Sequence, residues 1–137
     1  MSRLQFVPVW DVADVWPEVE PLLAKAVTKQ TAMSLDSLRE DCLRGKFWLW
    51  HIPSVVAMVT EIQQFPCERI EMIVLCGGLE MEQWIESADA TLTRHARHFG
   101  CDAVMIVGRQ GWSRAAPQYS AVASVMRKDL PKPGVPS

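Results

Sequence analysis

A long amphipathic helical pattern with a strand-like run on either side constrains the fold of this chain more than any other feature. The pattern extends from about Glu80 to Phe99, and Gly100 follows it as a typical residue just beyond a helix end. Strand-like runs cover 69–75 before it and 101–107 after it. Two strands joined by a crossover helix in one sheet run in parallel. We therefore expect one parallel strand pair at this point.

Three extended runs upstream of the helix indicate an antiparallel meander. They cover 47–52, 54–62 and 69–75, and a proline lies in each of the short breaks between them. Breaks of this length can join antiparallel neighbours but cannot hold a crossover.

The two ends of the chain add an edge strand, two helices and a last strand. Residues 4–9 contain a proline, as edge strands do. Helices are expected over about 14–29 and over 34–43, the second with Ser34 and Ser37 as rival caps.

The C-terminal part predicts a short helix or turn over 108–116 and a last strand over 119–128. We expect one domain, 1–130, followed by a flexible, Pro-rich tail, 131–137. The fold class is α/β of the α+β kind, a mixed, mostly antiparallel central sheet with one parallel strand pair and flanking helices.

Composition and charge argue against several classes of protein. Hydrophobic residues make up 49% of the 137 residues and charged ones 22%, which is typical of a packed globular domain. The net charge is −2 and no Lys/Arg run occurs, so we expect no nucleic-acid partner. No apolar run reaches the roughly 20 residues that cross a bilayer, and the N-terminus lacks a signal peptide's apolar core. We expect a cytoplasmic protein without a membrane partner.

The cysteines and histidines do not form a convincing metal site. Four cysteines, none in a Cys-x-x-Cys pair, are expected to be reduced and mostly buried. His95, His98 and Cys101 follow one another at intervals of three, but Gly100 should break the helix between them, and no further ligand completes the set. Positive charge at this helix end is explained by the helix dipole, so we expect no metal.

The order of the expected elements resembles the GNAT superfamily of acetyl-CoA-dependent N-acyltransferases over everything before the tail. The stretch Gly108-Arg109-Gln110-Gly111-Trp112-Ser113-Arg114 ahead of the last strand is similar to the C-terminal part of short, divergent GNAT-like proteins encoded by bacteriophages. Arg109, Trp112 and Arg114 are residue types enriched in interface hot spots, and we name them as interaction candidates. The alternative is that Trp112 packs the last helix onto the sheet.

The resemblance implies a coenzyme-binding turn between the strand ending at Leu75 and the long helix. In active members this turn reads Arg/Gln-x-x-Gly-x-Gly/Ala, and its N–H groups hold the coenzyme A pyrophosphate at the positive end of the helix. Here it reads Leu75-Cys76-Gly77-Gly78-Leu79-Glu80-Met81-Glu82, so Leu75, Gly77, Gly78 and Leu79 are the candidate coenzyme-binding residues. The basic or amide residue and the spaced second glycine are missing, and Glu80 and Glu82 would repel a phosphate.

The resemblance also implies catalytic roles. Glu71, on the strand before the turn, is the candidate base, and Tyr119, the single tyrosine, is the candidate acid. The alternatives are that Glu71 faces water and that Tyr119 packs as a half-buried aromatic.

Two functions follow from this sequence. The first is a phage-type GNAT-fold protein with a degenerate acyl-CoA site and no cofactor, which works through contacts with a phage or host protein as a virion-associated or assembly component. The second is an active acyl-CoA-dependent N-acyltransferase that uses acetyl-CoA and an unknown amine. We favour the first because the expected coenzyme turn is damaged.

Overall fold

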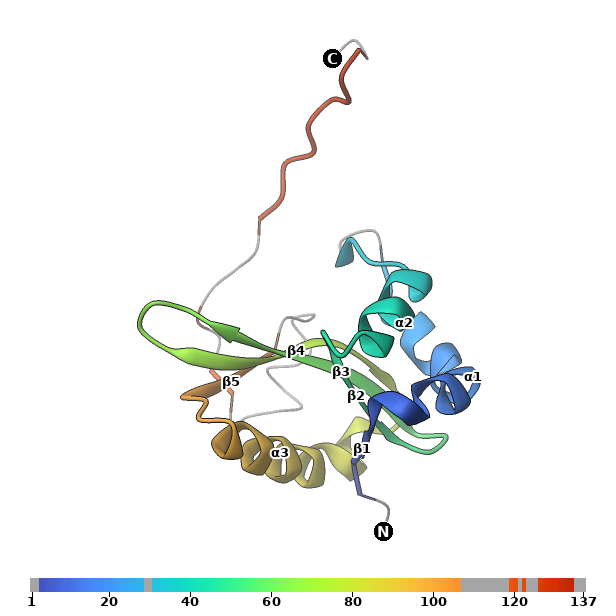
Figure 1. Cartoon of the computed structure of the whole chain (residues 1–137), viewed down its shortest axis with the longest axis vertical. Helices are drawn as coiled ribbons and strands as arrows, with labels where there is room; N and C mark the ends of the chain where they lie inside the picture. The colour runs from blue at the N-terminus through green and yellow to red at the C-terminus, as the bar shows by residue number, and fades with distance from the viewer. Residues whose placement is uncertain (1–2, 29–30, 107–118, 121, 123–125, 135–137) are drawn as a thin grey trace.

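A computed structural model describes residues 3–28, 31–106, 119–120, 122 and 126–134. Within these residues, five strands form one sheet with helices on both faces (Figure 1). The strands are β1 (Gln5–Val7), β2 (Trp48–Ile52), β3 (Val56–Gln64), β4 (Arg69–Gly78) and β5 (Ala103–Ile106), and they lie side by side in this order. The helices are the 3₁₀ turn η1 (Val9–Asp11), α1 (Val12–Ala24), α2 (Leu35–Leu43) and α3 (Met81–His98).

The sheet has the mixed topology that the sequence predicts. Strands β1 to β4 pair antiparallel, and β4 pairs with β5 in parallel from Ile70 opposite Ala103 to Ile73 opposite Ile106. Helix α3 makes the crossover between the parallel strands. The predicted fold class is therefore confirmed.

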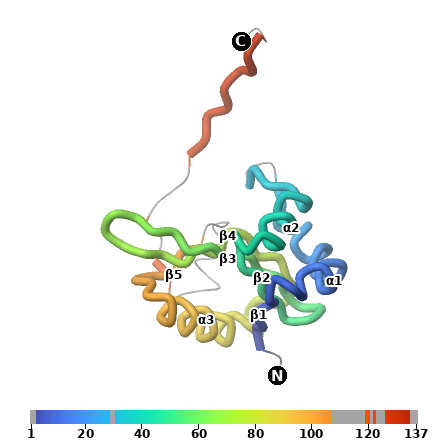
Figure 2. Tube along the Cα trace, viewed as in Figure 1, coloured from blue at the N-terminus to red at the C-terminus, as the bar shows by residue number. Residues whose placement is uncertain are grey.

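Two hydrophobic clusters fill the space on the two sides of the sheet. Helices α1 and α2 cover one face, where Val19, Leu23 and Leu38 pack against residues of β2, β3 and β4. Helix α3 covers the other face through Trp84, Ala88 and Leu92. The Cα trace in Figure 2 shows the β3–β4 hairpin projecting beyond the neighbouring strands.

The structure decides or corrects the sequence-based expectation for three elements. Helix α1 ends at Ala24, earlier than predicted. Ser34 caps α2, because its hydroxyl accepts the N–H of Ser37 while the Ser37 hydroxyl accepts the N–H of Ser34, both at 3.0 Å. The last strand is not seen in the described part of 119–128, where Val122 and Met126 are 76% and 92% exposed and do not pack on the sheet. The segment 108–116 lies outside the described residues.

A β-bulge at Val74 changes which side chains of β4 face α3. Val59 pairs with Leu75 but Thr60 pairs with Ile73, so Val74 has no partner of its own in β3. Ile73 belongs to the cluster under α3, whereas Val74 and Leu75 both contact the cluster under α1 and α2. The bulge thus separates two stretches of β4 with opposite alternation.

The close packing of α1 on the end of β4 depends on Gly77. A Cβ atom at this position would overlap the backbone carbonyl of Leu22 in α1, so any side chain must push the helix away. Gly77 pairs with Ala57 of β3, which holds its backbone in place from the other side.

We expect Gly77→Ala to lower the free energy of unfolding by about 3 kcal/mol or more, because the clash is with backbone that cannot rotate away. Gly100→Ala is the control, since no atom lies within 4 Å of a Cβ there and only the positive φ of 72° is strained. It should lose about 1 kcal/mol. Urea unfolding of both variants checks this, and equal losses would show that the approach of α1 is not tight.

Candidate functional site

The side chain of Glu71 is fully buried beneath α3 and is held by two protein donors. The Thr60 hydroxyl donates to its Oε2 at 3.0 Å, and Nδ1 of His95 lies 2.8 Å from Oε1 and 3.0 Å from Oε2. Trp50 donates its indole N–H to the Thr60 oxygen at 3.0 Å. The alternative that Glu71 faces water is therefore wrong, because α3 and its histidine cover this part of β4.

Aromatic rings enclose the histidine that pairs with Glu71. The imidazole of His95 meets Trp48 and Trp50 edge-on, at centroid distances of 4.3 and 4.8 Å, and Phe99 lies 4.8 Å away. Only 17% of the His95 side chain is exposed. A buried carboxylate is tolerated only when paired, and this enclosure keeps water from competing for the pair.

This arrangement has a defined chemical capacity. A carboxylate bonded to Nδ1 fixes the orientation of the ring and leaves Nε2 as the nitrogen that can exchange a proton with another group. Glu71 itself is separated from any solvent-borne group by His95 and Thr60, so a proton would reach it through the histidine.

Tyr119 lies against α3, where its hydroxyl donates to Oδ1 of Asp89 at 2.9 Å. Burial, and after it the hydrogen bond to Asp89, raise the pKa of Tyr119 well above its ordinary value. A raised pKa makes the phenol a weaker acid, and the hydrogen bond directs its proton to the helix.

The expected coenzyme turn is occupied by packing and by a strand ladder. Leu75 is buried in the cluster under α1 and α2. Gly77 and Gly78 both continue the ladder with β3, and a Cβ at Gly78 would lie 2.7 Å from the carbonyl oxygen of Val55. The N–H of Leu79 donates to that same oxygen at 2.9 Å. Close backbone approach therefore explains both glycines without a ligand.

The first turn of α3 carries negative charge where a pyrophosphate would have to lie. Glu80 precedes the helix in the left-handed conformation with φ 52°, and its side chain caps no backbone group. Glu82 lies in the first helical turn, and both side chains are exposed. Two carboxylates at the positive end of a helix satisfy its dipole and disfavour a second anion.

Among the described residues, no metal site forms beside the Glu71–His95 pair. No three His, Cys, Asp or Glu side chains in the described part of the chain are arranged to hold a metal ion. His98 packs edge-on against Phe99, 5.0 Å between centroids. Arg109, Trp112 and Arg114 lie outside the described residues.

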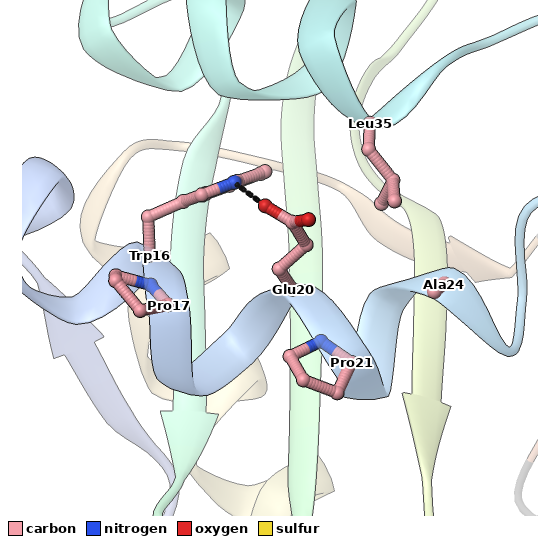
Figure 3. A pocket seen from close by; sticks show the side chains of 6 residues that line it. All are labelled: Trp16, Pro17, Glu20, Pro21, Ala24 and Leu35. Atoms are coloured by element: carbon pink, nitrogen blue, oxygen red, sulfur yellow. Dashed lines mark hydrogen bonds between the residues drawn. The ribbon is translucent and has the colours of Figure 1, made fainter.

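A shallow pocket of about 380 Å³ lies on the opposite side of the sheet, at the surface of α1 and α2 (Figure 3). Trp16 donates its indole N–H to Oε2 of Glu20 across it at 2.7 Å. The remaining lining residues are Pro17, Pro21, Ala24 and Leu35. Neither Glu71 nor His95, nor any side chain bonded to them, lines this pocket.

No helix among the described residues combines the length and the apolar character needed to span a bilayer.

Comparison with known proteins shows the fold. No protein-family model and no curated protein matches the sequence. Solved structures do match: a GNAT family acetyltransferase from Staphylococcus aureus has 11% identity and a TM-score of 0.63, over 95% of this chain and 100% of that one. Glucosamine-6-phosphate N-acetyltransferase from Arabidopsis thaliana has 12% identity and a TM-score of 0.65, over 96% and 99%. An acetyltransferase from Trypanosoma brucei has 17% identity and a TM-score of 0.58, over 95% and 100%. The chain has the GNAT fold.

The hydrogen-bonded partners of Glu71 are the residues that sequence reasoning missed. His95 and the neighbouring Ala96 both fit the apolar spacing of the long helix, so periodicity left open which of the two meets the sheet. Thr60 and Trp50 gave no signal, because neighbouring strands must be in register before their side chains can be paired.

We expect Glu71→Ala to lower the free energy of unfolding by about 3–5 kcal/mol, because it leaves His95 and Thr60 buried without an acceptor. Combined with His95→Ala it should lose less than the sum of the two single losses. Glu61→Ala, which removes a half-exposed carboxylate from β3, is the control and should lose no more than about 1 kcal/mol. Additive losses in the urea-unfolding cycle would contradict the pairing.

The cysteines differ from the expectation that they are mostly buried. All four are free, but only Cys42 is fully buried; Cys76 and Cys101 are partly buried, and Cys67 is exposed between β3 and β4. Burial raises the pKa of Cys42 and of Cys76 to about 12, with the nearby Asp41 adding to the effect at Cys42.

We therefore expect Cys67 to react first with a thiol reagent at pH 8, since little thiolate forms at the buried sites. Ellman titration should show one fast thiol in the native protein and all of them after unfolding in urea. Cys67→Ser should abolish the fast phase, and a fast phase that survives would contradict the assignment.

Proposed function

We propose that this chain is a GNAT-fold protein with a degenerate acyl-CoA site that acts through protein contacts and not through acyl transfer. The resemblance to short bacteriophage-encoded GNAT-like proteins implies a virion-associated or assembly component, in the host cytoplasm or in the virion. Its partner would then be a phage or host protein. No cofactor is part of this function.

The turn between β4 and α3 carries the proposal. Its two glycines meet backbone of α1 and β3, and the N–H of Leu79 is already bonded to Val55. Glu80 and Glu82 add negative charge at the helix end. A pyrophosphate needs free N–H groups and a positive potential. In this turn the N–H of Leu79 is no longer free, and the two carboxylates cancel the positive potential of the helix end.

Exposed aromatic side chains add support from outside the turn. Trp10 is 82% exposed, and Phe6 and Phe99 are about two-fifths exposed. Large aromatic residues at a surface are typical of binding sites for other proteins.

The second candidate is an active acyl-CoA-dependent N-acyltransferase, and the Glu71–His95 pair is the observation that favours it. Glu71 would act as the base through His95, Tyr119 as the acid, and acetyl-CoA would lie along Leu75 to Leu79. Acetyltransferases are among the proteins that share this fold. The acceptor would be an amine.

Titration calorimetry with acetyl-CoA separates the two functions. We expect no saturable binding by the native protein up to about 1 mM, a limit that corresponds to roughly −4 kcal/mol. Glu80→Gln with Glu82→Gln should strengthen binding by about 5- to 30-fold, since each charge near a helix end contributes up to about 1 kcal/mol.

Glu86→Gln is the matched control, because it removes the same charge one turn further along the exposed side of α3. It should behave like the native protein. Micromolar binding of acetyl-CoA by the native protein would overturn the proposed function and support the transferase.

A further inference from the structure

One edge of β3 is open in the described structure. Strand β2 pairs with β3 only as far as Trp48 opposite Thr60, whereas β4 continues to Gln64 opposite Arg69. Among the described residues, no strand pairs with 61–64 on the β2 side. This is the hairpin that projects beyond the other strands in Figures 1 and 2.

The chain before β2 is drawn away from this edge by α2. The N–H groups of Lys46 and Phe47 both donate to the backbone carbonyl of Asp41, at 2.9 and 3.3 Å. Continuing the β2–β3 register would place Lys46 opposite Ile62, but its N–H is already bonded to Asp41 and is not available to β3.

The alternation of the hairpin fixes which backbone groups the open edge presents. Phe65 donates its N–H to the carbonyl of Glu68 at 2.8 Å, so odd-numbered residues of this part of β3 bond to β4. Ile62 and Gln64 consequently point their N–H and C=O groups outward. An extended strand can add to such an edge by bonding to the backbone groups of alternate residues, here Ile62 and Gln64.

Aromatic side chains border the open edge on the α3 side of the sheet. Phe99, 41% exposed, packs 4.9 Å from Trp48 of β2, and its carbonyl accepts the Nε–H of Arg69 of β4 at 2.9 Å. Phe99 thus spans from β2 to β4 across the α3 side of β3, where Ile62 also lies. We call Trp48 and Phe99 the aromatic ledge.

Basic side chains border the same place. Lys46 is exposed where the chain leaves the edge, and His98 of α3 is exposed and packs edge-on against Phe99 of the aromatic ledge. The one carboxylate on this part of β3, Glu61, accepts a hydrogen bond from Gln63 at 3.3 Å. A second copy of this chain would bring the same cations together, so the charges favour a different partner with acidic side chains.

We propose that the β3 edge, Glu61–Gln64, binds an extended segment of a partner protein by strand addition. An apolar side chain of that segment lies on the aromatic ledge, and acidic side chains lie beside Lys46 and His98. This inference rests on the proposed function, because it names the surface through which the protein contacts act.

Amide exchange and peptide titration, followed by NMR on the full chain, test the proposal. In the free protein, the amides of Ile62 and Gln64 should exchange fast while those of Glu61 and Gln63 are protected. The probe is a capped Asp-Val-Thr-Val-Asp peptide. It should shift the NMR signals of the Ile62 and Gln64 amides and of the Trp48 indole, with a dissociation constant of about 1 mM.

Gln64→Pro removes one outward N–H and should weaken peptide binding by about 5-fold or more. A proline is tolerated where the N–H faces solvent, so the fold should persist. Gln64→Ala is the matched control, since it loses the same side chain and keeps the N–H. It should bind like the native protein.

Four outcomes would overturn the proposal. They are protected Ile62 and Gln64 amides in the monomer, protection that grows with protein concentration, equal binding by Gln64→Pro, and equal binding of a peptide with lysine ends. None of them affects the acetyl-CoA titration, which tests the proposed function separately.

Discussion

The pairing of the Glu71 carboxylate with His95 is the interaction on which the second half of this fold depends. A fully buried carboxylate is strongly unfavourable alone, and here it is bonded by side chains from β3 and α3 at once. The bonds join three consecutive elements, β3, β4 and α3, and they fix where the C-terminal half of α3 crosses the sheet. The aromatic rings around His95 then exclude water from the pair.

The N-terminal end of the same helix is fixed in a different way. Gly77 lets α1 approach β4, and the N–H of Leu79 extends the ladder to Val55, so the chain enters α3 from a strand that is paired with β3 up to its end. The Leu79 bond occupies one of the N–H groups that a coenzyme turn would offer to a phosphate. The turn thus contributes to the packing of the fold through the same residues that the resemblance names as coenzyme-binding candidates, and a shared fold does not by itself imply a shared activity.

The sequence predicts the order of elements well and the faces of the strands less well. Periodicity identifies the meander and the crossover helix, since both are local patterns. It cannot decide whether Glu71 faces water or α3, because the bulge at Val74 reverses the alternation within one strand. The bulge can be recognised only from the pairing of β4 with β3, which the sequence does not give. Packing likewise shows that Gly77 permits the close approach of α1 and Gly78 that of the chain at Val55 and Val56, which no motif in the turn reveals.

The bonds to the Asp41 carbonyl link the end of α2 to the shape of the sheet edge. By holding Lys46 and Phe47, they close α2 and leave β3 longer than its neighbour. Proteins usually blunt such an edge with inward charges, prolines or bulges, and 61–64 contains only Glu61 as a charge. An edge left open beside exposed aromatic and basic side chains is more consistent with binding than with a structural accident. The proposed strand-addition surface therefore lies opposite the first residues of β4, at the other end of that strand from the turn in which the resemblance places a coenzyme.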